Sequence, residues 1–96
     1  MENRDEIKAK LTQLKAELGV QFHIKSLGLF GSAVRKDFSV NSDIDILVEF
    51  DRPIGMEFIE LAEILEKRLE RPVDLISKKG VKEKYLKSIM EDIVYV

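Results

Sequence analysis

The chain has 96 residues, of which 45% are apolar and 35% charged, and its formal net charge is −2. This length and apolar content allow one buried core, so we expect a single folded domain over residues 1–96 rather than a disordered chain. The near balance of charges and the absence of cysteine exclude a disulfide framework, a thiolate zinc site and a general attraction to nucleic acid or membranes. No apolar run is long enough for a signal peptide or a membrane span, so we expect a cytoplasmic protein.

The first half of the chain predicts a helix, a strand and a turn. Four apolar residues recur at helical spacing: Ile7, Leu11, Leu14 and Leu18. They predict a first helix over residues 5–18, ending at Gly19. The short apolar run at 26–30 predicts a buried strand. A Gly-Ser pair then predicts a turn into a short helix at 33–35, and the polar stretch 36–42 predicts a loop.

The second half predicts two more strands, two more helices and an apolar tail. Residues 44–50 are rich in β-branched side chains and predict a second strand. Helical spacing predicts a long helix over 58–69 and a last helix around 85–90, with a third strand at 73–76 between them. The tail at 93–96 is expected to pair as an edge strand, or else to form part of a partner surface. This alternation favours a layered α/β (α+β) domain with helices on a small sheet.

Two aspartates lie two residues apart at the start of the second strand. The period of a strand places Asp43 and Asp45 on one face, while Ile44 and Ile46 point to the other. Carboxylates held this close repel each other, and divalent cations that prefer oxygen ligands, such as Mg²⁺, offset the repulsion. The pair therefore predicts a metal site, although an isolated Asp-x-Asp is more often only a solvated loop feature.

Two other features accompany this pair. Gly31 and Ser32 end the first strand, where free backbone N–H groups and a hydroxyl could bind a phosphate, although such a pair is often only a turn and a helix cap. Asp74 lies between Val73 and Leu75 in an apolar strand, where burial of an unpaired carboxylate would be costly. It either completes a three-carboxylate cluster beside the second strand or pairs with a nearby lysine or arginine.

Together, these motifs resemble the DNA polymerase β-like nucleotidyltransferase superfamily. The shared pattern is a Gly-Ser turn, ten intervening residues, Asp-Ile-Asp-Ile and a later strand aspartate. Residues 29–35 and 42–48 are similar, more narrowly, to the minimal nucleotidyltransferase family, which includes antitoxins of the MntA type. The resemblance implies a small mixed sheet flanked by helices, Mg²⁺ and ATP as cofactors, and transfer of AMP to a tyrosine of a HEPN-family toxin ribonuclease. Such pairs form prokaryotic toxin–antitoxin modules.

The resemblance also implies roles for individual residues. The catalytic residues, which would hold two Mg²⁺ ions, are Asp43, Asp45 and Asp74. The nucleotide-binding residues are Gly31, Ser32, Arg35 and Ser42, with the glycine and the first serine on the β- and γ-phosphates. Arg35 is open between a phosphate contact and a structural salt bridge. One residue departs from the family pattern, because Lys36 stands where the family commonly has glycine.

The short chain limits the kind of acceptor. Larger enzymes of the superfamily use additional domains to hold the acceptor, and 96 residues leave no room for one, so the resemblance favours a partner protein as substrate. Two alternatives are an antitoxin that acts by occlusion without catalysis and the catalytic subunit of a two-chain enzyme that modifies an antibiotic. Neither a membrane nor direct nucleic-acid contact is expected. Tyr85 and Tyr95 are interpreted as core or interface residues.

Overall fold

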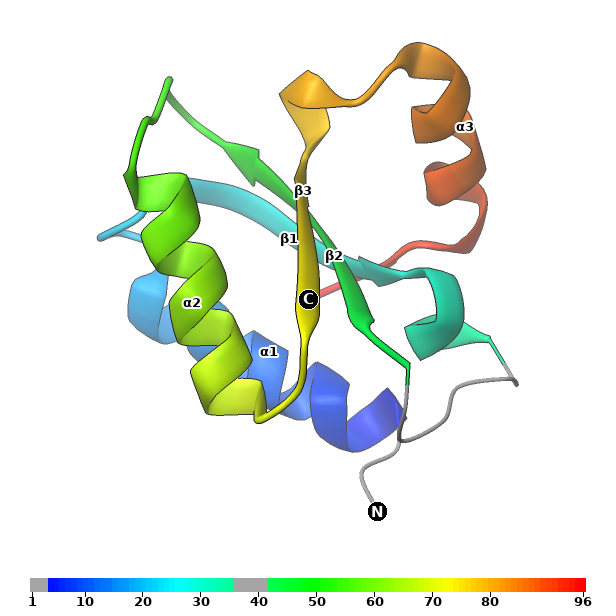
Figure 1. The fold of residues 1–96 in the computed structure, drawn as a ribbon, viewed down its shortest axis with the longest axis horizontal. Helices are drawn as coiled ribbons and strands as arrows, with labels where there is room; N and C mark the ends of the chain where they lie inside the picture. Colours follow the sequence, from blue (N-terminus) through cyan, green and yellow to red (C-terminus); the bar gives the residue numbers. More distant parts are fainter. Residues whose placement is uncertain (1–3, 36–41) are drawn as a thin grey trace.

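The computed structural model describes residues 4–35 and 42–96, and within these ranges every predicted helix and strand is present (Figure 1). The helices are α1 (Arg4–Leu18), α2 (Glu57–Leu69) and α3 (Glu83–Asp92). The strands are β1 (Ile24–Phe30), β2 (Ile44–Phe50), β3 (Val73–Ser77) and β4 (Val94–Tyr95). Two short 3-10 helices complete the chain, η1 (Gly31–Val34) and η2 (Lys78–Gly80). The first of them replaces the short helix predicted at 33–35, and most of the loop predicted at 36–42 lies outside the described residues.

The strands form one mixed sheet in the order β3-β2-β1-β4. Strand β1 pairs antiparallel with both β2 and β4, whereas β2 pairs parallel with β3. A parallel pair needs a crossover connection, and α2 supplies it. The mixed sheet flanked by helices confirms the predicted fold class.

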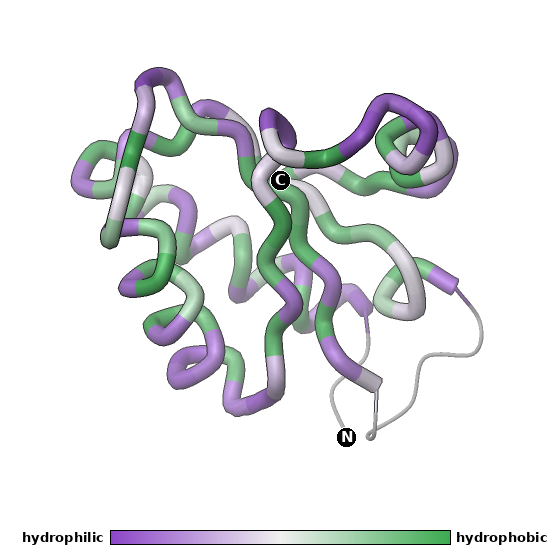
Figure 2. The backbone as a smooth tube through the Cα atoms, turned by 45° about the horizontal axis from the view of Figure 1, so that its top comes forward, coloured by the Kyte–Doolittle hydropathy of each residue, from purple (hydrophilic) through white to green (hydrophobic). Residues whose placement is uncertain are grey.

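One face of the sheet packs against α1 and α2 and forms the hydrophobic core (Figure 1). Alternate residues of the central strand point into this core and are fully buried: Ile44, Ile46 and Val48. In both helices apolar residues recur at helical spacing among polar ones, so that each helix buries one apolar stripe of its surface (Figure 2). No helix in the described residues has the length and apolar character needed to cross a membrane.

The C-terminal segment packs on the other face of the sheet. A Cβ atom on Gly28 of β1 would lie 2.5 Å from Cδ1 of Ile93, so this glycine leaves the space that the isoleucine fills. Strand β4 continues from there along the edge of β1, and Val96 packs against the core. The tail is therefore an edge strand, as predicted. Its path holds α3 beside η1 at the end of the sheet where the aspartates lie (Figure 1).

Candidate active site

Strands β2 and β3 bring the predicted aspartates to one region of the sheet. Asp45 and Asp74 are directly opposite each other in the parallel pair, and Asp43 precedes β2 by one residue. Asp45 is half-buried and its neighbours Ile44 and Ile46 are fully buried, so the acids and the isoleucines point to opposite faces, as predicted. The structure thus places Asp74 beside the second strand, as the first of the two alternatives requires, but on an edge strand of the sheet.

The prediction that Asp74 is a buried acid was wrong. Its side chain is exposed, because β3 is an edge strand of the sheet and no helix covers this position on the aspartate face. Strand order cannot be read from one sequence, so the apolar neighbours Val73 and Leu75 gave the wrong impression of burial. Exposure leaves the Asp74 carboxylate accessible to a ligand.

Gly31 lies directly against the Asp45 carboxylate. Its φ angle is +67°, a left-handed conformation that residues with a side chain rarely adopt. A Cβ at this position would collide with Oδ2 of Asp45 and lie 3.2 Å from its Cγ. The close approach of turn and carboxylate therefore requires glycine for two separate reasons.

Ser32 connects the turn to Asp43 and Asp45 through hydrogen bonds. Its hydroxyl donates a hydrogen bond to the backbone carbonyl of Asp43 at 3.4 Å, and a backbone hydrogen bond from Ser32 to the Asp45 carboxylate lowers the pKa of Asp45. The helix that begins here, η1, has only four residues. Individual N–H groups, and not a long helix dipole, are therefore what this turn offers to a phosphate.

The surroundings of Asp45 disfavour the charged form of its carboxyl group. Burial, the charge of Asp74 and the charge of Asp43 raise its pKa above the ordinary value of 3.8, in that order of size. The positive charge of Arg35 and the hydrogen bond from Ser32 act in the opposite direction. Burial is the largest cause of the net rise, and the two neighbouring carboxylates add to it.

The donors present are those that a hard divalent cation prefers. Among the described residues, no three acidic, histidine or cysteine side chains are gathered closely enough to form a ready-made metal site. However, the negative charges of Asp43 and Asp74 repel the carboxylate of Asp45. A bound divalent cation would relieve this repulsion. Carboxylate chemistry and charge at this position therefore fit Mg²⁺.

Two other residues of the sequence pattern, Arg35 and Ser42, lie at the margin of the site. Arg35 forms an ion pair with Asp92 of α3, with Nη2 and Oδ2 3.3 Å apart, and so has a structural partner near the carboxylates. The backbone carbonyl of Ser42 accepts a hydrogen bond from Nη2 of Arg71 at 2.6 Å, which fixes the chain just before the aspartates. Lys36, the departure from the family pattern, lies outside the described residues.

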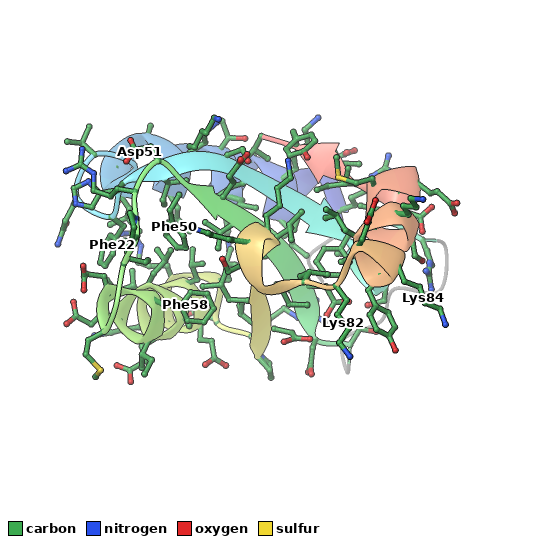
Figure 3. All side chains as sticks on the ribbon, turned by 90° about the horizontal axis from the view of Figure 1, so that it is seen from above. Phe22, Phe50, Asp51, Phe58, Lys82 and Lys84 are labelled. Carbon is green, nitrogen blue, oxygen red and sulfur yellow. The ribbon has the colours of Figure 1, made fainter. Side chains whose placement is uncertain are left out.

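A cleft of about 710 Å³ opens between η1 and α3. Gly31, Ser32 and Arg35 line one side, and Asp45 also lines the cleft. The opposite wall includes a stripe of α3 that the sequence analysis did not assign to the site: Tyr85, Ser88, Ile89 and Asp92. Their i, i+3, i+4, i+7 spacing is the signal that could have shown them to share one helix face. Lys82, just before α3, also lines the cleft and lies on the side of the molecule away from Phe22 (Figure 3).

Comparison of sequences identifies relatives that extend over the whole length of the chain. Residues 7–96 match the family model described as a nucleotidyltransferase domain. A relative from Methanocaldococcus jannaschii is 46% identical over 100 residues that cover all of both chains. The protein adenylyltransferase MntA of Thermococcus cleftensis is 42% identical over 93 residues, covering 96% of this chain and 94% of the relative.

Solved structures share the fold at lower identity. A chain of a toxin–antitoxin crystal structure with AMP-PNP matches with a TM-score of 0.78 and 24% identity, over 92% of this chain and 70% of that chain. A chain of the complex between a tri-AMPylated Shewanella oneidensis HEPN toxin and its MNT antitoxin matches with a TM-score of 0.72 and 20% identity, over 96% and 70% of the two chains. The architecture is therefore one that solved toxin–antitoxin complexes also contain.

Proposed function

The chain belongs to the family of nucleotidyltransferase domains, and we propose that this single domain transfers AMP from ATP, with Mg²⁺, to a hydroxyl of a HEPN-type toxin in a cytoplasmic toxin–antitoxin pair. One observation carries the proposal. The half-buried Asp45 lies opposite Asp74 across the sheet and in contact with Gly31 of the turn. This arrangement places carboxylates beside backbone groups that suit a phosphate chain.

The residues that line the cleft and the two carboxylates next to Asp45 have separate roles in the proposed reaction. Gly31 and Ser32 of the turn bind the phosphates, and Arg35 adds positive charge near them. Asp43, Asp45 and Asp74 would hold Mg²⁺, which when bound neutralises charge on the phosphates and makes the acceptor hydroxyl more acidic. Binding of the triphosphate against a fixed turn would limit the motion of its α-phosphorus and so favour attack by the acceptor.

Transfer then requires one bond to form and one to break. The acceptor oxygen bonds to the α-phosphorus, the bond from that phosphorus to the bridging oxygen breaks, and pyrophosphate leaves. Asp74, whose side chain is exposed at the sheet edge, accepts the hydroxyl proton. An exposed base suits an acceptor that arrives on another molecule.

Names of the relatives support the choice of AMP and of the acceptor. The Thermococcus cleftensis relative is called a protein adenylyltransferase, and the Shewanella oneidensis complex contains an AMPylated HEPN toxin. A nucleotide analogue accompanies another of the similar structures. A tyrosine hydroxyl of the toxin is the acceptor that we propose.

The test is transfer of label from ATP to the toxin. The purified chain is incubated with Mg²⁺ and a co-expressed HEPN-type toxin, in parallel with α-³²P-ATP and with γ-³²P-ATP. We expect label on the toxin from the α-labelled nucleotide alone, because pyrophosphate carries the γ-phosphorus away. The double variant Asp43→Asn/Asp45→Asn should lose this labelling, whereas Asp51→Asn, an exposed acid paired with Arg52 outside the cleft, should keep it.

Other results would select the alternatives. Equal inhibition of the toxin by the wild-type chain and by the double variant, without any label, would mean that the chain acts by occlusion. Label on an added aminoglycoside and not on protein would indicate the catalytic subunit of an antibiotic-modifying enzyme. Either result would overturn the proposed protein acceptor.

A further inference from the structure

Helix α3 gives one of its faces to the cleft. None of its residues is fully buried, unlike the leucines that anchor α1 and α2 in the core. Instead, the stripe of Tyr85, Ser88, Ile89 and Asp92 forms a wall opposite the Gly-Ser turn. One face of the amphipathic helix α3 therefore lines the cleft, and none of its residues is fully buried in the core.

Part of the cleft lining next to this wall is apolar. Ile76, Val81 and Ile89 are half-buried and line the cleft together. Beside them Tyr85 keeps 60% of its surface exposed, which is unusual for a large aromatic side chain that lines a cleft. An exposed aromatic ring in a cleft that apolar residues also line can stack on a flat ligand group.

The other tyrosine, Tyr95, differs from Tyr85 in its side-chain partner and in its place in the fold. Tyr95 of β4 is 42% exposed, but its hydroxyl donates a hydrogen bond to Sδ of Met90 and it does not line the cleft. The backbone N–H of Tyr85 donates to the carbonyl of Lys82, but its side chain makes no hydrogen bond or ring contact with the other described residues, so the ring is available to a ligand in the cleft.

The two walls together suit a ligand with an anionic end and a flat apolar end. The cleft volume of about 710 Å³ is within the range of small-molecule sites. The Arg35–Asp92 ion pair joins η1 to α3, so both walls belong to one site. Phosphates on the turn would direct the other end of a nucleotide toward the α3 wall.

We propose that Tyr85 stacks on the nucleobase of the bound nucleoside triphosphate, with Val81 and Ile89 as the apolar surface beside it. This inference rests on the proposed function and adds the group that binds the base. Stacking of a base on an aromatic ring contributes about 1–3 kcal/mol, and it requires the ring but not the hydroxyl. The contribution is absent for a ligand that has phosphates and no base.

The experiment compares two ligands by calorimetry in buffer with Mg²⁺: AMP-PNP, and inorganic tripolyphosphate, which lacks the base. We expect Tyr85→Ala to weaken AMP-PNP binding by about tenfold and to leave tripolyphosphate binding unchanged. Tyr85→Phe should bind AMP-PNP like the wild type, because it keeps the ring. Tyr95→Ala is the matched control and should change neither affinity.

A spectroscopic measurement separates stacking from indirect effects. The chain contains only two tyrosines, so the ring protons of Tyr85 can be assigned by comparison with Tyr95→Phe. AMP-PNP should shift these resonances upfield through the ring current of the base, and tripolyphosphate should not. An unchanged spectrum would overturn the stacking role.

Failure of this inference differs from failure of the proposed function. If the wild-type chain binds AMP-PNP and Tyr85→Ala binds it equally well, the base is held elsewhere and the inference is wrong. The same conclusion follows if Tyr85→Ala weakens only the binding of the toxin. If the wild-type chain does not bind AMP-PNP at all, the proposed function itself fails.

Discussion

At the scale of single residues, the site depends on how closely Gly31 approaches Asp45. We predict that Gly31→Ala lowers activity by about 100-fold, because the new methyl group displaces a carboxylate and misplaced catalytic groups are costly. The free energy of unfolding should fall by only about 1–2 kcal/mol, the cost of a left-handed alanine. Urea denaturation and label transfer measure the two effects.

Gly55→Ala is the matched control for this substitution. A Cβ on Gly55 meets only Oε1 of Glu57, at an ordinary 3.9 Å, and its φ angle is not in the left-handed region. Activity and stability should therefore stay close to those of the wild type. If both alanine variants retained full activity, the contact between turn and carboxylate would not matter for catalysis.

The raised pKa of Asp45 predicts a dependence of stability on pH. Because its pKa is higher in the folded than in the unfolded chain, the ionised carboxylate costs stability at neutral pH. That cost is relieved as the pH falls through the folded-state pKa toward the ordinary value of 3.8. Without Mg²⁺, Asp45→Asn should thus be more stable than the wild type at neutral pH, and the difference should disappear near pH 3.8.

Thermal unfolding across this pH range tests the prediction. Added Mg²⁺ should reverse the order at neutral pH, because only the wild type keeps all three carboxylates for the cation. Asp51→Asn should show no gain in stability, since it loses an ion pair with Arg52 at 3.1 Å. A wild-type chain more stable than Asp45→Asn in metal-free buffer would show that the repulsion is already compensated in another way.

At the scale of elements, the C-terminal segment positions α3 through its contact with β1. A side chain on Gly28 would overlap Ile93, whose Cδ1 and Cγ1 lie 2.5 and 2.6 Å from the position of a Cβ. We predict that Gly28→Val lowers the free energy of unfolding by about 1–3 kcal/mol through overpacking. Nucleotide binding should weaken as well, because α3 carries the wall of the cleft.

A double-mutant cycle checks this cause. Ile93→Ala removes the overlapping side chain, so Gly28→Val should cost much less in the Ile93→Ala background than in the wild type. Equal costs in both backgrounds would mean that the valine acts on β1 itself. Urea unfolding of the four proteins gives the coupling energy.

The elements themselves could be predicted from the sequence because each leaves a local pattern. Helical spacing gave α1 and α2, and β-branched residues gave the bounds of β2. The start of β1 at Ile24 was missed, since the exposed Lys25 interrupts the apolar run. The turn became a 3-10 helix, a difference of hydrogen bonding that no side-chain pattern encodes.

Candidate site residues were predictable only where a motif kept them together. Gly31, Ser32, Asp43 and Asp45 lie within one short segment, and the structure brings Asp74 beside them through the parallel pairing of β2 and β3. The Arg35–Asp92 pair joins residues 57 positions apart, and the α3 wall depends on where the C-terminal segment packs. Both result from tertiary structure, which spacing along the chain does not specify.

At the scale of the whole molecule, the shape agrees with the proposal that the acceptor lies on another molecule. The chain measures 34 × 30 × 18 Å, and α1 and α2 cover one face of the sheet. The cleft lies between η1 and α3. Such a site can hold a nucleotide while leaving the α-phosphorus open to another molecule.

An acceptor on another molecule predicts that the rate of pyrophosphate release depends on the toxin. The chain alone should bind ATP but release pyrophosphate slowly, because only water is available as the acceptor. Addition of the toxin should raise pyrophosphate release by at least about 100-fold, because a bound and oriented hydroxyl gains the advantage of proximity. A toxin variant in which phenylalanine replaces the acceptor tyrosine should bind without this increase. Pyrophosphate release that is equally fast with and without the toxin would instead mean that water or the chain itself is the acceptor, and the open cleft would then need another explanation.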